Sequence, residues 1–149
     1  MFQGAAELSL DAKGRLAIPA RHREALAAAA NGTLVLTVNP QGCLLLYPLP
    51  DWEPIRDKIL RAPSFDPRSA ALKRVLVGNA RNEEMDAAGR VLLASELRDQ
   101  AGLEKTVWLV VMGTHFEIWS DSGWKQQRAV AAAALQGDAP PAGFEDFSL

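Results

Sequence analysis

The segment Asp11-Ala12-Lys13-Gly14-Arg15 recurs 75 residues later as Asp86-Ala87-Ala88-Gly89-Arg90. The similarity continues past both segments at identical spacing: Leu16-Ala17-Ile18-Pro19 and Arg23 follow the first, and Val91-Leu92-Leu93-Ala94 and Arg98 follow the second. A later set of residues also matches: Leu44, Leu46, Tyr47, Trp52 and Arg56 with Phe116, Ile118, Trp119, Trp124 and Arg128. Self-similarity over so long a period indicates a tandem duplication, which constrains the architecture more than any single motif does.

The composition is that of a globular protein with a core. With 149 residues, 48% of them hydrophobic, the chain has room for one ordinary domain or two very small, interlocked ones. No apolar run approaches the roughly 18 to 20 residues of a membrane span, and no export signal is visible. The single cysteine, Cys43, lies in an apolar run and is interpreted as core filler in a reducing cytoplasm.

The charge is unevenly distributed. The net charge is −2, but residues 1–75 carry +3 and residues 76–149 carry −5. Local clustering of basic residues matters more to a polyanion than the total does. The distribution modestly favours the first half as a surface for nucleic acid.

Alternation and turn residues predict a β-hairpin at the start of each copy. In the first copy, residues 6–10 alternate apolar and polar side chains, residues 11–14 form a turn, and residues 15–18 resume the alternation. In the second copy the corresponding strands are residues 82–86 and 90–93.

The remaining elements repeat in the same order. Strands are expected at 33–38, 43–47, 107–112 and 116–119, and helices at 21–30 and beginning at Asp51, Asp66, Ser95 and Asp121. The helix from Asp66 has no counterpart in the second copy. We therefore divide the chain into a first repeat (1–61), a linking helix (62–80), a second repeat (81–135) and a flexible, Gly/Pro-rich and acidic tail (136–149).

Several segments resemble a known family. The two Asp-x-x-Gly-Arg turns with their flanks are similar to AbrB-type (SpoVT-AbrB) swapped-hairpin DNA-binding motifs. Four segments narrow the resemblance to the MraZ family of bacterial transcriptional regulators: Met1-Phe2-Gln3-Gly4, Asp11 to Pro19, Leu45-Leu46-Tyr47-Pro48-Leu49-Pro50 and Met85 to Arg90. The resemblance implies a β-rich α+β fold, in which tandem AbrB-like motifs form a pseudo-two-fold barrel with flanking helices.

The resemblance also implies a function and partners. It implies a sequence-specific DNA-binding regulator that represses the division and cell-wall gene cluster through repeated boxes in its promoter. Its partners would be double-stranded DNA and further copies of the chain in a ring-shaped homo-oligomer. The protein would be cytoplasmic and nucleoid-associated, with no membrane, small-molecule or cofactor partner.

The family motif assigns DNA contacts to the arginine after each turn, Arg15 and Arg90, and to the helix arginines, Arg23 and Arg98. Lys13 belongs to the first turn, whereas the second turn has Ala88 there. Residue chemistry independently favours the first copy, where four cations lie within eleven residues: Lys13, Arg15, Arg21 and Arg23. Arginine's planar fork suits phosphate oxygens and the guanine edge, and a β-ribbon can enter a major groove. The second copy is acidic before its turn, at Glu83 and Glu84.

Structural roles are open for the same residues. Asp11 with Arg15, and Asp86 with Arg90, could form ion pairs that lock the turns, and Gly14 and Gly89 are expected to serve turn geometry. Arg21 and Arg23 could belong to a solvated helix face. The recurrent aromatic residues are interpreted as core or interface anchors: Tyr47, Trp52, Trp119 and Trp124.

Competing functions find less support. No nucleophile-histidine pair, G-x-S-x-G motif or Gly-rich phosphate loop is present, so no catalytic residues are assigned. His22 and His115 lack neighbours at metal-ligand spacing, so no metal site is expected. The alternative function is an antitoxin-like protein-binding module of the same hairpin fold. Two copies in one chain and a short tail favour the regulator.

Overall fold

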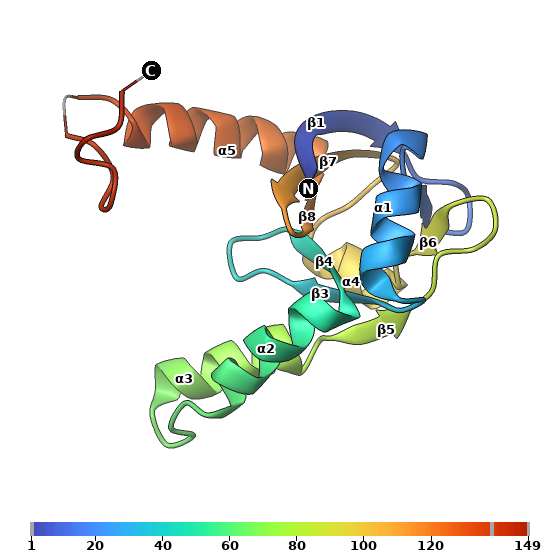
Figure 1. The fold of residues 1–149 in the computed structure, drawn as a ribbon, viewed down its shortest axis with the longest axis horizontal. Helices are drawn as coiled ribbons and strands as arrows, with labels where there is room; N and C mark the ends of the chain where they lie inside the picture. The colour runs from blue at the N-terminus through green and yellow to red at the C-terminus, as the bar shows by residue number, and fades with distance from the viewer. Residues whose placement is uncertain (1, 138, 149) are drawn as a thin grey trace.

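The computed structural model describes residues 2–137 and 139–148 (Figure 1). Within these residues, eight strands and six helical segments follow the repeated order expected from the sequence. In chain order they are β1 (Phe2–Ser9), β2 (Arg15–Ala17), α1 (Ala20–Ala30), β3 (Leu34–Val38), β4 (Leu44–Pro48), α2 (Leu49–Leu60), α3 (Pro67–Leu72), the π-helical turn η1 (Lys73–Val77), β5 (Arg81–Glu83), β6 (Arg90–Leu92), α4 (Ser95–Gln100), β7 (Thr106–Gly113), β8 (Phe116–Ser120) and α5 (Asp121–Ala134).

The fold is β-rich α+β, as expected, and is built on a large antiparallel sheet. Six strands form this sheet in the order β1-β7-β8-β4-β3-β5, and β2 and β6 form a separate two-stranded ribbon. Over the described residues, β1 and β5 are the edges of the large sheet and neither sheet closes on itself. The expected pseudo-two-fold barrel is therefore not confirmed.

The strands on either side of each turn pair with the other repeat. β1 pairs with β7, β3 with β5, and β2 with β6. The predicted hairpins of 6–10 with 15–18, and of 82–86 with 90–93, are wrong as strand pairs. Alternation specifies which face of a strand is buried, but main-chain hydrogen bonds leave the partner open. What remains local is the tight turn itself, closed by Gly14 N–H to the Asp11 carbonyl at 3.0 Å.

The large sheet is covered on both faces (Figure 1). One face packs against the ribbon, α1 and α4 in a core that includes Leu16, Leu26, Val91 and Leu97. The other face packs against α2, η1 and the first turns of α5. Every residue of β3 and β4 is consequently buried. Cys43 belongs to the second core and is fully buried, which confirms it as core filler.

Three of the four expected helix caps are misplaced, although α4 and α5 begin at Ser95 and Asp121 as expected. Asp66 caps α3 as predicted, because its carboxylate accepts the Arg68 main-chain N–H at 3.1 Å. Asp51, Ser95 and Asp121 lie instead inside the helices that they were expected to cap. For α5 the cap is Ser120, whose hydroxyl accepts the Gly123 N–H.

The centre of the ribbon predicts a stability difference between its two faces. Leu16 is fully buried in the core, whereas Leu92 on the opposite face is 44% exposed. Leu16→Ala should lower the free energy of unfolding by about 2–5 kcal/mol, because it leaves a cavity. Leu92→Ala, the matched control, should change it by less than about 0.5 kcal/mol. Urea unfolding at one fixed protein concentration measures both, and equal losses would contradict this packing.

Candidate nucleic-acid interface

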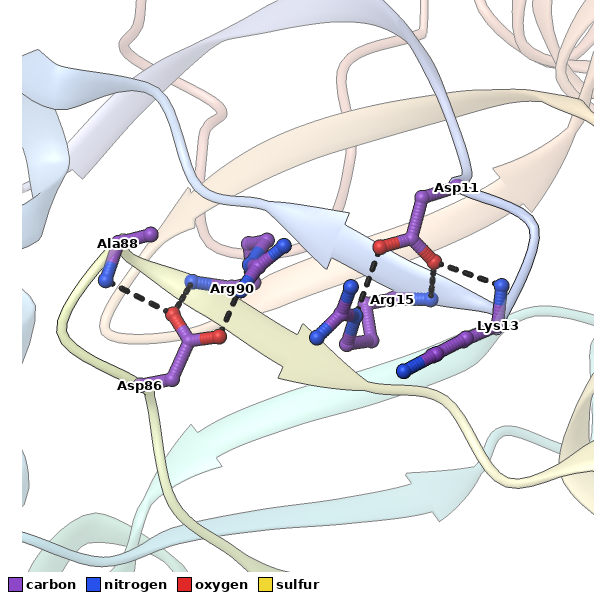
Figure 2. Close-up of polar contacts among 6 residues, drawn as sticks. All are labelled: Asp11, Lys13, Arg15, Asp86, Ala88 and Arg90. Atoms are coloured by element: carbon purple, nitrogen blue, oxygen red, sulfur yellow. Dashed lines mark hydrogen bonds and ion pairs between the residues drawn. The ribbon is translucent and has the colours of Figure 1, made fainter.

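The first turn is organised around the carboxylate of Asp11. Its Oδ1 accepts the main-chain N–H groups of Lys13 and Arg15 at 3.0 and 2.9 Å. Its Oδ2 accepts Nε of Arg15 at 2.7 Å, which makes an ion pair (Figure 2). Gly14 completes the turn with φ of +79°, a conformation that favours glycine. The Asp-x-x-Gly-Arg spacing therefore builds a turn whose arginine is held by its own aspartate.

The second turn reproduces this arrangement atom for atom. Asp86 accepts the main-chain N–H groups of Ala88 and Arg90 at 2.9 and 2.8 Å, and Nε of Arg90 at 2.9 Å (Figure 2). Gly89 has φ of +78°. The ion pairs considered from the sequence are thus present in both turns.

These bonds lower the pKa of both aspartates. The pKa of Asp11 lies below its usual value, chiefly because the Arg15 main-chain N–H donates to the carboxylate. The pKa of Asp86 is lowered in the same way by Arg90. The same hydrogen bonds therefore stabilise the ionised carboxylates that hold the two arginines.

Each ion pair leaves most of the guanidinium available. Arginine has five N–H donors, of which Nε supplies one. Over the described residues, no hydrogen bond engages the terminal amino groups of Arg15 or Arg90. The side chains remain 27% and 38% exposed. The aspartate thus positions each guanidinium without occupying the fork that could meet an anion.

The ribbon carries both arginines on its exposed face. Arg15 lies opposite Leu92, and Ala17 lies opposite Arg90. Between these pairs Leu16 lies opposite Val91, and both are fully buried. Opposed residues share a face and neighbouring residues alternate, so Arg15 and Arg90 are diagonal neighbours on the exposed face. Exposed Lys13 extends the basic surface at the first turn.

The helix arginines lie elsewhere. Arg23 of α1 donates from Nε to the Ile18 carbonyl at 2.7 Å, and Arg98 of α4 donates to the Leu93 carbonyl at 2.8 Å. Each guanidinium lies against the turn glycine of the other repeat. A Cβ added to Gly14 would lie 2.7 Å from Cζ of Arg98, and one added to Gly89 would lie 2.8 Å from Cζ of Arg23.

The fourth cation of the first copy, Arg21, is exposed on α1. Its Nε donates to Nε2 of His22 at 3.1 Å. His22 is buried with its ring edge-on to Phe116, and burial lowers its pKa. Arg21 therefore lies on the surface of α1 against its neighbour, and no hydrogen bond in the described chain links it to either turn.

One of the two acidic residues before the second turn is partly buried. Glu83 lies in β5 opposite Leu34, and burial raises the pKa of its carboxyl group. Glu84, which follows, is exposed. The second turn is thus preceded by one partly buried and one exposed glutamate, and it lacks the lysine of the first turn.

Nothing in this arrangement suggests a metal or a reactive thiol. In residues 2–137 and 139–148, no three His, Cys, Asp or Glu side chains are placed to hold a metal ion. Burial raises the pKa of the Cys43 thiol to about 12. None of the helices described is long and apolar enough to cross a membrane.

Sequence reasoning missed two features of this surface. It did not place Leu92 on the same ribbon face as the two arginines, and it did not pair the helix arginines with the turn glycines. A signal for the second was available, since the glycine and the helix arginine recur with the same 75-residue offset. Both features depend on β2 pairing with β6, which neither copy specifies alone.

Comparison with known proteins agrees with the duplicated geometry. A family model described as "MraZ protein, putative antitoxin-like" matches the chain twice, at residues 1–75 and 76–140. The chain belongs to the MraZ family. It is 69% identical to a protein of Dechloromonas aromatica, 62% identical to one of Aromatoleum aromaticum and 58% identical to one of Azoarcus sp.. Each comparison covers the whole of both chains, and each relative is named transcriptional regulator MraZ.

The family match fits the repeat found in the sequence. The two MraZ matches meet between residues 75 and 76, the same offset that separates the two turns. Each match therefore contains one Asp-x-x-Gly-Arg turn, one ribbon strand and one helix arginine. The ribbon face exists only where the two MraZ units meet.

The turn carboxylates predict an acid-sensitive contribution to stability. A pKa that is lower in the folded chain than in the unfolded one stabilises the fold above the unfolded value of about 4. This contribution is lost as the pH falls through the folded value. We expect an Asp11→Asn, Asp86→Asn variant to be less stable at pH 7 and to lose less stability between pH 5 and pH 3 than the parent chain. Thermal melting over this range measures both, and parallel curves would refute the assignment.

The glycine contacts predict unequal costs at two turns with the same backbone angle. Gly14 and Gly113 both have φ of +79°, but only Gly14 has neighbouring atoms within 4 Å of an added Cβ. Gly113→Ala should cost about 1–2 kcal/mol of backbone strain. Gly14→Ala should cost clearly more, because the methyl group must also displace Arg98. Equal urea midpoints for the two variants would show that the Arg98 contact contributes nothing.

Proposed function

We propose that this MraZ-family chain is a sequence-specific DNA-binding transcriptional regulator, and that the exposed face of the β2–β6 ribbon contacts the DNA. The observation that carries the proposal is the diagonal pair of aspartate-held arginines on that face. The names of the relatives support the regulatory role.

The ribbon suits a major groove in shape and chemistry. A two-stranded ribbon fits the roughly 12 Å width of the groove, and a guanidinium fork can bond guanine O6 and N7. Arg15 and Arg90 present such forks, and Lys13 adds a point charge suited to phosphate. We assign the stronger contact to the first turn, which carries the lysine that the second lacks.

The pairing of strands between the two repeats supports a proposal about the DNA-binding fold. We propose that the two turns and their strands form an AbrB-like swapped-hairpin unit. Reciprocal bonds support this: Ile18 N–H donates to the Gly89 carbonyl at 2.9 Å, and Leu93 N–H to the Gly14 carbonyl at 3.0 Å. Each turn is thereby tied to the strand end of the other repeat.

We also propose that copies assemble into a ring-shaped homo-oligomer. A single ribbon presents few cations, so one chain should bind DNA weakly. Several ribbons bound to repeated promoter boxes would gain affinity through effective concentration. The unpaired outer edge of β1 in the described sheet leaves room for association between copies. The proposed DNA target is the promoter of the division and cell-wall gene cluster, which the protein would repress. We propose that it acts in the nucleoid and catalyses no reaction.

Removing the first ribbon arginine tests the proposed DNA contact. Arg15→Ala should abolish the preference for the chain's own upstream DNA over a scrambled duplex, while the melting temperature and oligomeric state stay close to those of the parent. Fluorescence anisotropy over a salt series measures binding. Each phosphate contact contributes about −0.9 to the slope of log affinity against log salt, which separates phosphate from base contacts.

The matched control is Arg56→Ala. Arg56 of α2 is also a partly exposed arginine, and it pairs with Asp57 at 3.1 Å. This variant should bind DNA as the parent does. Normal binding by Arg15→Ala would refute the assignment of Arg15 to DNA and favour the antitoxin-like alternative, whereas an unfolded Arg15→Ala would make Arg15 a structural residue.

A further inference from the structure

Two equivalent sets of contacts connect each helix arginine with the turn of the other repeat. Leu93 N–H donates to the Gly14 carbonyl, the Leu93 carbonyl accepts Nε of Arg98, and the Arg98 guanidinium lies against Gly14. In the second set, Ile18 N–H donates to the Gly89 carbonyl, the Ile18 carbonyl accepts Nε of Arg23, and the Arg23 guanidinium lies against Gly89. Each helix arginine therefore contacts the turn of the repeat to which it does not belong.

We propose that Arg98 and Arg23 are positioning residues for DNA recognition rather than DNA contacts. Arg98, in the second repeat, holds the first turn and so sets the position of Arg15. Arg23, in the first repeat, holds the second turn and so sets the position of Arg90. This inference rests on the proposed function and assigns it two further residues.

The geometry explains why both partners are needed. Gly14 and Gly89 are buried, although each lies in a turn beside an exposed ribbon face. A side chain at either glycine would meet the guanidinium at less than any normal contact distance. The flat fork of arginine can lie on the glycine backbone while its Nε bonds a carbonyl group. Lysine lacks both the plane and the Nε donor.

The location of Arg98 is consistent with this role. It borders an open groove of about 470 Å³ together with Leu10, which precedes the first turn, and with Asp11 and Ala12 of that turn. Asp11 in turn holds Arg15 by the 2.7 Å ion pair. A change at Arg98 can therefore reach Arg15 through the turn that both residues contact.

Because each helix arginine contacts the turn of the other repeat, the two arginines should differ in their effect on DNA binding. If the first turn makes the stronger DNA contact, Arg98→Lys should weaken specific binding more than Arg23→Lys does, although Arg98 lies in the other repeat. We expect Arg98→Lys to reduce affinity roughly 5- to 150-fold, the range that corresponds to losing one bidentate base contact.

Double-mutant cycles on the full-length chain test the proposal. Affinity for a duplex of the chain's own upstream DNA is measured at fixed salt, well below each melting temperature. Arg98→Lys should be strongly non-additive with Arg15→Lys and additive with Arg90→Lys, while Arg23→Lys should show the reverse. A structural role alone would lower the melting temperature without this pairing.

The outcomes separate the inference from the proposed function. Additive losses for Arg98 and Arg15 would make Arg98 an independent contact, and unchanged affinity with a lower melting temperature would make it only structural. Either result overturns the inference while the DNA-binding function stands. If the parent chain does not prefer the upstream duplex to a scrambled one, both proposals fall.

A glycine pair decides the matter if the lysine variants do not fold. Gly14→Ala removes no charge but displaces Arg98, whereas Gly113→Ala imposes the same backbone strain with no neighbour. Gly14→Ala should reduce specific affinity and Gly113→Ala should leave it near that of the parent chain. Equal affinities would overturn the inference.

Discussion

The structure depends on two main-chain hydrogen bonds exchanged between the repeats, from Ile18 to Gly89 and from Leu93 to Gly14. Each joins the end of a ribbon strand in one copy to the turn of the other. A strand of three residues is too short to be stable alone, so β2 and β6 exist because they pair with each other and bury Leu16 and Val91. The two copies are consequently one folding unit, although they are two separate repeats in the sequence.

The exchange also decides what the surface can do. A turn closed only on its own strand would present one arginine. Two turns joined through the ribbon present Arg15 and Arg90 as diagonal neighbours on one face, with the apolar residues beneath them. The aspartate of each turn fixes the direction of its arginine, and the helix arginine of the other copy lies against its glycine. Charge, backbone geometry and packing thus converge on the same small surface.

The same residue type serves two purposes in this fold. The arginines that follow the turns donate Nε to an aspartate of the same turn, whereas Arg23 and Arg98 donate Nε to main-chain carbonyl groups and lie against the turn glycines of the other repeat. Arginine suits both roles because its charge is permanent and its plane is rigid. The turn arginines and the helix arginines recur at the same offset in the sequence, so sequence spacing alone does not distinguish their roles.

The sequence by itself determined the duplication, the two turns, the α+β class and most strand positions, because these follow from local alternation, from turn chemistry and from recurrence at a fixed offset. It also located Asp11, Arg15, Asp86 and Arg90 within one motif. Only the tertiary structure decided that strands pair across the repeats, that the sheet stays open and that Arg23 and Arg98 lie on the opposite turns. Main-chain hydrogen bonds carry no residue code for their partner, and a guanidinium group takes its direction from the packing around it.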